Sequence, residues 1–353
     1  QARDTYGDVA GLLGESGLAA RDVLGETVFL RDVRDAAPFL EERARVLGED
    51  APLPSLVGQA PLDGSALQVV ATAIAPAAPG APRDAVDLRV ERPCTCAACT
   101  LAGARLVRLG GRSILRTSGL QGIGASLFEQ AIDAFRAGDR LLRESGLGFH
   151  DVVRTWVWLR DIDRDYAELN AARRAFFAEC GLARPPASTG VQGIPQGEGH
   201  DVSIVVEATS RAGASAPESM TTPLLNEAPS YGADFSRGLR VADEQGTTLF
   251  VSGTASIDEA GRSVHPGDLA AQAGRMLDNV ESLLAERGAR TFDLVSGVVY
   301  AKRPQDGPAL REICHGRGFR GFPCVFVEAP LCRPELLCEA EFVARLSLPV
   351  AGA

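Results

Sequence analysis

The sequence predicts a mixed α/β (α+β) fold made of three tandem copies of one unit, with the first copy incomplete. One pattern occurs three times: a helix ending in a Gly turn, an Asp followed by Val or Leu, an apolar strand, a charged turn and a second helix. The three Asp residues are Asp22, Asp151 and Asp293. Internal repeats of this kind indicate a structural unit that is used more than once. The length of 353 residues agrees, because it exceeds what one compact domain usually holds.

The first copy is expected at residues 1–76. A Gly turn at residues 16–18 leads to Asp22 and to an apolar strand at residues 27–33, and a β-rich run at residues 66–74 closes the copy. Copies two and three each open with a hairpin, and the first copy starts after the point where that hairpin would lie. The first copy is therefore expected to be a partial unit.

The second copy is expected at residues 104–211. It opens with a hairpin at residues 104–118, has an apolar strand at residues 156–162 and closes with a β-rich run at residues 201–208. The strand runs are rich in β-branched and aromatic residues, and the intervening helix carries apolar residues three and four positions apart. These spacings are typical of strands and of an amphipathic helix.

The third copy is expected at residues 228–353, with a hairpin at residues 240–252, a strand at residues 297–303 and a closing strand within residues 335–344. We expect this copy to be the catalytic one, for reasons given below. The residues between copies are rich in Ala, Ser and Pro, which is typical of linkers. The predicted linkers are residues 77–103 and residues 212–227.

The composition is that of an ordinary globular protein, with 45% hydrophobic and 23% charged residues. The net charge of −10 argues against a nucleic-acid partner, which would require clustered Lys and Arg. No long apolar run is present, so we expect no membrane partner. No signal peptide is visible at the start of the sequence, and a cytoplasmic location is expected.

Three of the eight cysteines, Cys94, Cys96 and Cys99, form a CxCxxC cluster. They are candidate metal ligands, but their spacing is not that of a standard zinc module, and the sequence offers no fourth ligand. The four histidines are scattered without ligand spacing: His150, His200, His265 and His315. We therefore expect plain thiols and no bound metal. No P-loop or GxGxxG motif is present, so no cofactor is expected.

The order of elements resembles the RidA/YjgF family across nearly the whole chain. The motifs that carry this resemblance are residues 249–253, Gln272 and Asn279 on the following helix, and the closing residues 337–341. Phe235 stands where the family often has Tyr. The resemblance implies a chorismate-mutase-like fold, and because family members are typically trimers with pockets between subunits, it implies a pseudo-trimer within one chain.

The second and third copies also resemble chorismatases, which use two such units. The matching features are Arg154-Thr155-Trp156, Tyr166 with Arg173, residues 186–190, residues 253–257, residues 265–268, Cys332-Arg333 and residues 336–339. Val298 departs from this pattern, because chorismatases tend to carry a basic residue there.

Glu339 makes the third copy different from the other two. The Arg that holds a carboxylate in RidA-type imine deaminases is missing from the equivalent stretch of all three copies. The closing strand of copy three carries Glu339, whereas the equivalent stretch of copy two is apolar, with Glu207 matching Glu341, and copy one has no carboxylate. A carboxyl group in a partly apolar pocket has a raised pKa and can donate a proton near neutral pH.

By resemblance to chorismatases, Glu339 would protonate the enolpyruvyl methylene carbon of a small carboxylated enol ether, and Cys332 would steer the type of product. Candidate substrate-binding residues are Arg333, Arg173, Arg237, Phe235, Ser252, Gly253, Thr254 and Tyr300. The expected partner is a small carboxylated metabolite of secondary metabolism, and the expected assembly is a monomeric pseudo-trimer or a homodimer. We favour a hydrolase or lyase over an enamine or imine deaminase and over a non-catalytic binding scaffold.

Simpler interpretations of these residues stay open at this point. Glu339 and Glu341 are two positions apart and could lie on a solvent-facing strand edge. Cys332 could be a small buried hydrophobic residue. Arg173 could belong to a solvated helix face.

Overall fold

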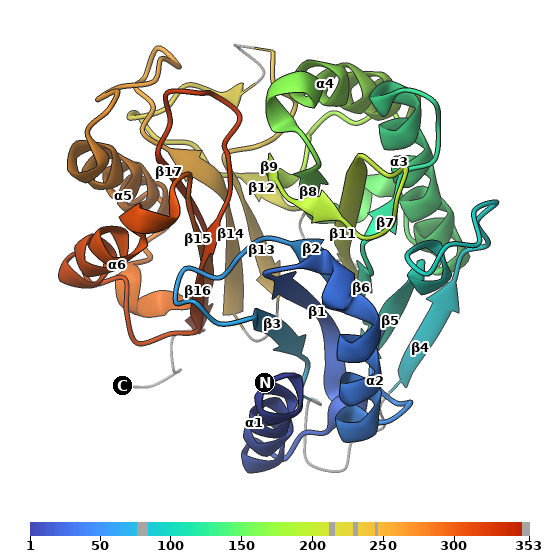
Figure 1. The fold of residues 1–353 in the computed structure, drawn as a ribbon. Coiled ribbons are helices and arrows are strands. Elements are labelled where there is room, and N and C mark those ends of the chain that lie inside the picture. Colours follow the sequence, from blue (N-terminus) through green and yellow to red (C-terminus); the bar gives the residue numbers. More distant parts are fainter. Residues whose placement is uncertain (76–83, 212–215, 229–231, 244–245, 348–353) are drawn as a thin grey trace, which may run out of the picture.

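The computed structural model contains three β-sheets with helices packed on their outer faces (Figure 1). It describes residues 1–75, 84–211, 216–228, 232–243 and 246–347. Each sheet belongs to one of the three predicted units, which confirms the tandem α/β architecture. Among the described residues, no helix is both long and apolar enough to cross a membrane.

The first unit has a four-stranded sheet in the order β10-β2-β1-β3, of which β10 comes from the second unit. Its elements are α1 (Ala2–Glu15), β1 (Val23–Leu30), α2 (Ala36–Leu47), β2 (Ser55–Gly58) and β3 (Leu67–Ala73). Within the described residues, this sheet lacks an opening hairpin like those of the other two units. The first unit is therefore incomplete, as the sequence predicted.

The second unit has a seven-stranded sheet, ordered β4-β5-β6-β11-β8-β9 with β7 beside β11. Its elements are β4 (Asp84–Arg89), β5 (Gly103–Leu109), β6 (Arg112–Thr117), β7 (Leu120–Gln121), α3 (Leu127–Glu144), β8 (Val152–Leu159), α4 (Ile162–Glu179), β9 (Ala187–Gln192), β10 (Ile194–Pro195) and β11 (Val202–Arg211). The helix α3 begins with a capping box, in which Ser126 and Glu129 bind each other's backbone N–H groups.

The third unit has a six-stranded sheet in the order β12-β13-β14-β17-β15-β16. Its elements are β12 (Glu218–Ser219), β13 (Gly238–Asp243), β14 (Gly246–Ala255), α5 (Leu269–Ala285), β15 (Leu294–Ala301), α6 (Gly307–Gly316), β16 (Cys324–Glu328) and β17 (Cys338–Ser347). Short 3-10 helices occur at Ala20–Asp22, Val33–Asp35, Cys99–Leu101, Phe149–Asp151, Thr291–Asp293 and Pro304–Asp306.

The central strand has the same neighbours in every unit. β1, β8 and β15 each pair in parallel with the strand after the second helix and antiparallel with the closing strand. A parallel pair requires a crossover connection, and α2, α4 and α6 supply it. The repeated sequence pattern therefore corresponds to a repeated pairing scheme.

The stretches predicted as linkers contain short strands. Residues 84–89, within the predicted linker 77–103, form β4 and pair with β5. Residues 218–219, within the predicted linker 212–227, form β12 and pair with β13. Residues 77–83 and 212–215 lie outside the described part of the chain.

The three units meet along seams, two of which border unit two. The first seam lies where β1 of unit one faces the hairpin β5–β6 of unit two, and Arg116 donates a hydrogen bond to Thr27 of β1 across it at 3.1 Å. The second seam lies where β9 of unit two faces β14 of unit three, and the Ser188 N–H donates to Ser252 Oγ at 2.9 Å. Units one and three also touch, since the Leu62 N–H donates to the Phe326 carbonyl at 2.9 Å. These contacts close the units into a pseudo-trimer.

Candidate active site

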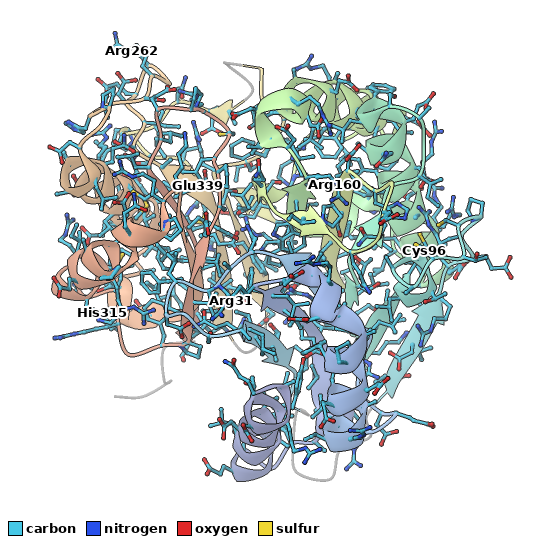
Figure 2. The ribbon with its side chains drawn as sticks, in the orientation of Figure 1. Arg31, Cys96, Arg160, Arg262, His315 and Glu339 are labelled. Atoms are coloured by element: carbon cyan, nitrogen blue, oxygen red, sulfur yellow. The ribbon has the colours of Figure 1, made fainter. Side chains whose placement is uncertain are left out.

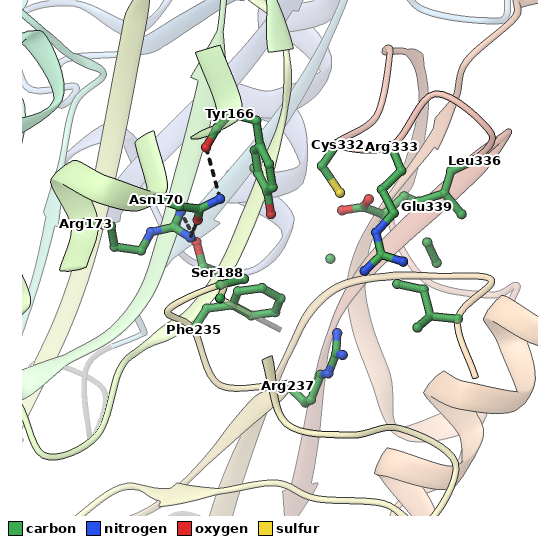
Figure 3. A pocket seen from close by; sticks show the side chains of 16 residues that line it. Tyr166, Asn170, Arg173, Ser188, Phe235, Arg237, Cys332, Arg333, Leu336 and Glu339 are labelled. Atoms are coloured by element: carbon green, nitrogen blue, oxygen red, sulfur yellow. Dashed lines mark hydrogen bonds between the residues drawn. The ribbon is translucent and has the colours of Figure 1, made fainter. Parts of the chain in front are cut away.

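A pocket of about 290 Å³ opens at the second seam (Figure 3). It is lined by Tyr166, Asn170, Arg173, Ser188 and Gly190 of unit two and by Gly232, Ala233, Phe235, Arg237, Gly253, Ala255, Ile257, Cys332, Arg333, Leu336 and Glu339 of the third unit. Of the ten residues proposed from the sequence for catalysis or substrate binding, the pocket brings together seven: Glu339, Cys332, Arg333, Arg173, Arg237, Phe235 and Gly253.

Glu339 lies near the start of β17, where it is paired with Ala255 on β14 and Tyr300 on β15. Its side chain is buried, with 5% of its surface exposed, and among the described residues no hydrogen bond to its carboxyl group occurs. Gly253 makes room for this carboxyl group, because a Cβ at that position would lie 2.1 Å from Glu339 Oε1. The carboxyl group is therefore available to a ligand in the pocket.

The pKa of Glu339 is raised to about 8, chiefly by burial and also by the neighbouring carboxylate of Glu341, whereas Arg154 and Arg237 act in the opposite direction. Glu341 is bound differently, because Arg154 Nη2 and Trp156 Nε1 each donate a hydrogen bond to it at 2.7 Å. Two adjacent carboxyl groups thus have different environments, which is how one of a pair is kept as an acid.

The interpretation of Glu339 and Glu341 as a solvent-facing edge is wrong, since they are only 5% and 6% exposed. The interpretation of Arg173 as part of a solvated helix face is also wrong. Arg173 is 2% exposed, whereas its neighbour Arg174 is exposed. Arg173 lies on the buried face of α4 together with Leu169 and Phe176, and it reaches Ser188 on β9, at the edge of unit two that meets unit three.

Three arginines approach the pocket from different elements (Figure 3). Arg173 on α4 donates to Ser188 Oγ at 3.4 Å and to Asn170 Oδ1 at 3.5 Å. Arg237, just before β13, donates to the Asn226 carbonyl at 2.9 Å. Arg333 donates to the Gly261 carbonyl at 2.8 Å. Their guanidinium groups retain a positive charge under all ordinary conditions, so the pocket favours anions.

Cys332 lies beside Glu339 and next to Tyr166 (Figure 3). Burial raises the pKa of the Cys332 thiol to about 12, and the proximity of Glu339 contributes to this rise. The thiol is therefore neutral near pH 7 and is not a ready nucleophile.

Three residues predicted to bind substrate do not line the pocket. Ser252 accepts the Ser188 N–H bond and donates to the Ser236 carbonyl at 2.5 Å, so it fastens the seam. The Thr254 hydroxyl donates to the Ser252 carbonyl at 2.8 Å. Tyr300 is fully buried beside Glu339, and burial raises the pKa of its phenol. These three side chains are buried behind the residues that line the pocket.

Other residues of the site were not among the predicted ligands. Tyr166, Asn170 and Ser188 line the pocket from unit two, and Arg154 binds Glu341 from the same unit. The sequence signal for Tyr166, Ser188 and Arg154 was present, since each lies in a stretch that resembles chorismatases, but it did not indicate which side chains reach unit three.

The register of the closing strands shows what the other two units carry in place of Glu339. Tyr300 faces Glu339, Trp158 faces Ser203 in unit two, and Phe29 faces Gln68 in unit one. The proposed match between Glu207 and Glu341 is wrong. In unit two, Glu207 on the closing strand β11 is paired with Arg116 on β6. In unit three, the residue at the equivalent place on the closing strand β17 is Val343, which is paired with Phe250 on β14, so Glu207 corresponds to Val343. Glu339 has no carboxylate counterpart in either of the other units.

The CxCxxC cysteines lie away from this pocket, as the positions of Cys96 and Glu339 in Figure 2 show. The sequence offered no fourth ligand for them, but the structure places His200 beside the three cysteines. Its ring and the three sulfur atoms of Cys94, Cys96 and Cys99 lie within 4.8 Å of one another.

Comparison with known proteins supports both resemblances. No protein-family model matches the chain. The chain is 30% identical over 222 residues to a 3-hydroxybenzoate synthase of Streptomyces hygroscopicus, covering 56% of this chain and 64% of that protein. It is 29% identical over 119 residues to a RutC family protein of Pyrococcus abyssi, covering 33% of this chain and 91% of that protein. The match to the synthase spans somewhat less than two thirds of its length.

A crystal structure of a chorismatase has the same fold. It aligns with 92% of this chain and 93% of its own, with a TM-score of 0.67 and 20% sequence identity. Together these matches confirm the resemblance to chorismatases and to RidA/YjgF-type units.

Proposed function

We propose that this chain is a cofactor-independent, chorismatase-like enzyme that cleaves a small carboxylated enol ether by acid catalysis, with Glu339 as the proton donor. The observation that carries the proposal is the state of Glu339. Its carboxyl group is buried in a pocket between two units, its pKa is raised to about 8, and three arginines stand around the same pocket. A general acid works best when its pKa lies near the working pH.

The charge of the pocket indicates the class of substrate. Three guanidinium groups line the pocket, and among the described residues that line it Glu339 is the one acidic side chain, inside a protein with a net charge of −10. Arg binds carboxylates in a planar, bidentate geometry. The volume of about 290 Å³ lies at the small end of ligand pockets. A compact molecule with two carboxylates, such as chorismate, fits this description.

The reaction follows from a proton on Glu339. The electron pair of the enol ether double bond takes that proton at the methylene carbon, which leaves an oxocarbenium ion at the ether carbon. Water adds to this carbon and returns a proton to the Glu339 carboxylate. The resulting hemiketal collapses by breaking the bond between this carbon and the ether oxygen, which takes up the proton of the hemiketal hydroxyl group, so that pyruvate and an alcohol are released. The negative charge on Glu339 after proton transfer stabilises the cation.

The thiol of Cys332 bears on which product forms. It is neutral, adjoins Glu339, and occupies the position that holds Cys in chorismatases making a hydroxybenzoate. A relative of this chain is named as a 3-hydroxybenzoate synthase. Addition of water gives a dihydrodiol acid, whereas a hydroxybenzoate and pyruvate together contain the atoms of chorismate and no added water. We therefore expect that an oxygen nucleophile within the substrate, in place of water, completes the loss of pyruvate, and that the ring then loses a proton to become a hydroxybenzoate.

Incubation of the full chain with chorismate tests the proposal. Pyruvate release is followed with lactate dehydrogenase, and the aromatic product is identified by chromatography and mass spectrometry. Glu339→Gln should abolish release, whereas Glu312→Gln, which removes an exposed carboxylate on α6, should not.

If wild-type protein releases no pyruvate, chorismate is not the substrate. Ammonia release from 2-aminoacrylate would favour a deaminase instead, and tight binding of a small acid without turnover would favour a binding scaffold.

A further inference from the structure

Four side chains that the active site does not use converge at the edge of unit two. Cys94, Cys96 and Cys99 lie between β4 and β5, and Cys99 begins a short 3-10 helix. His200 precedes β11, about a hundred residues further along the chain. The three sulfur atoms lie 3.8, 3.3 and 3.6 Å from His200 Nε2, in chain order.

We propose that Cys94, Cys96, Cys99 and His200 bind one Zn²⁺ ion in a structural, four-coordinate site. Zinc binds Cys sulfur at about 2.3 Å and His nitrogen at about 2.0 Å, which in a tetrahedron places sulfur and nitrogen about 3.5 Å apart. The observed distances of 3.3 to 3.8 Å scatter around that value. Three thiolates and one imidazole form a ligand set that selects zinc among the common divalent ions.

Hydrogen bonding alone does not account for this arrangement. In a neutral imidazole, Nε2 has one lone pair when Nδ1 carries the proton, so it can accept a single S–H bond. Three sulfur atoms nevertheless converge on the same nitrogen of His200. A cation bonded to all four atoms satisfies every one of them.

The surroundings of His200 fix the ring in the form that a metal requires. His200 Nδ1 lies 2.7 Å from the Gly122 carbonyl, which can only accept, so Nδ1 carries the proton and Nε2 faces the sulfurs. Metal-binding histidines commonly have such a backbone partner. The Cys99 N–H also points at Cys96 Sγ, at 3.4 Å, as expected for a charged sulfur atom.

The loop around the cluster is packed against it. A Cβ on Gly197 would lie 3.2 Å from the His200 ring and 3.6 Å from Cys96 Sγ, and its φ of +92° also favours glycine. Arg160 donates to the carbonyls of Gly197 and His200, at 3.0 and 2.9 Å. The loop is therefore shaped to bring His200 to the cysteines.

The position of the site indicates what the ion would do. The segment that ends at His200 also contains β10, which pairs with β2 of unit one through Ile194 and Pro195. A zinc ion would tie this connecting segment to the loop before β5. Because four protein ligands leave no open position for water or substrate, the ion would be structural.

Metal analysis of the full chain tests the proposal. Protein purified without chelator from zinc-supplemented medium is expected to contain about one zinc ion per chain. Cys96→Ser should reduce zinc to below about a tenth of that amount, because it removes one of four ligands. Cys180→Ser is the matched control: it changes a partly buried free thiol outside the cluster and should retain the zinc.

A second measurement does not depend on the folding of a variant. Wild-type protein stripped of metal is titrated with Co²⁺, and the visible bands of a tetrahedral thiolate site should grow to one equivalent and disappear on addition of Zn²⁺. The proposal is overturned if wild type contains no zinc and takes up no Co²⁺ in this form. It is also overturned if folded Cys96→Ser retains a full equivalent of zinc.

Discussion

The two seams beside unit two share a backbone arrangement but differ in what their side chains leave open. At the second seam, Glu339 faces the small Ala255, and the space between the units is a pocket. At the first seam the equivalent positions are Ser203 and Gln121, and Gln121 Nε2 donates a hydrogen bond to Ser203 at 3.1 Å. Gln121, which stands where unit three has Ala255, therefore occupies the hydrogen-bonding capacity of the Ser203 hydroxyl group that faces it.

Each seam also has a buried ion pair. Arg116 binds Glu207 at 3.1 Å at the first seam, and Arg154 binds Glu341 at 2.7 Å at the second. Both guanidinium groups stack on Trp156, at 4.4 and 5.0 Å from a ring centroid. The difference between the seams is therefore local: at the proposed active site, a carboxyl group without a hydrogen bond among the described residues faces an open pocket, whereas at the first seam the equivalent Ser203 is bound by Gln121.

The largest expected effect comes from replacing Glu339 at the second seam with serine, the residue that the first seam has at the equivalent position, Ser203. Glu339→Ser removes the proposed proton donor and should lower kcat by roughly 10² to 10⁴-fold, the usual contribution of a general acid. Its KM should change little, because the three arginines remain. An unchanged kcat in pyruvate release would place the acid elsewhere.

Loss of a pocket arginine should have the next largest effect. Arg173→Met removes charge-assisted contacts to a substrate carboxylate, and kcat/KM should fall by about ten- to a hundredfold. Arg140→Met changes an exposed arginine on α3 and should match wild type. Equal kinetics for both variants would show that Arg173 serves only to hold Ser188 and Asn170.

The pH dependence should distinguish Glu339 from ordinary carboxyl groups. Because the acid form donates the proton and its pKa is about 8, activity should fall above pH 8 by about tenfold per unit. Stability should follow the same group. Between pH 4.5, the ordinary pKa of a Glu side chain, and pH 8, the folded protein keeps the proton on Glu339 whereas the unfolded chain has lost it. The free energy of unfolding should therefore decrease as the pH rises from 4.5 to about 8.

Glu339→Gln should remove this contribution. At pH 8 it should be more stable than wild type, by at most about 5 kcal/mol for a shift of this size, and near pH 4 the difference should vanish. Chemical denaturation at both pH values measures this. A constant difference between the two proteins would contradict a raised pKa.

The smallest effect is expected from substitution of the glycine at each seam, Gly253 at the second and Gly119 at the first. A Cβ at Gly253 would meet Glu339 Oε1 at 2.1 Å, so Gly253→Ala should displace the carboxyl group and lower kcat by roughly tenfold, the cost of a misplaced general acid. At the first seam, a Cβ at Gly119 would meet Ser203 Oγ at 2.9 Å, and Gly119→Ala should leave activity unchanged. Equal loss in both variants would indicate a general effect on packing between units.

The sequence alone determined the repeated unit and singled out Glu339 as the carboxyl group without a counterpart in the other two units. Local patterns carry this information, because the period of apolar residues specifies strands and helices and the same order recurs three times. Seven predicted residues consequently line one pocket. The error in matching Glu207 to Glu341 has a physical reason: side chains alternate with a period of two, so a shift of two residues preserves the faces of a strand.

Only the tertiary structure decided which side chains meet across units. Arg154 is separated from Glu341 by 187 residues and Cys99 from His200 by 101, and no spacing within a segment encodes such pairs. They are set by the packing of one sheet against the next. The raised pKa of Glu339 has the same origin, because burial comes from two units closing around a carboxyl group that only one of them supplies.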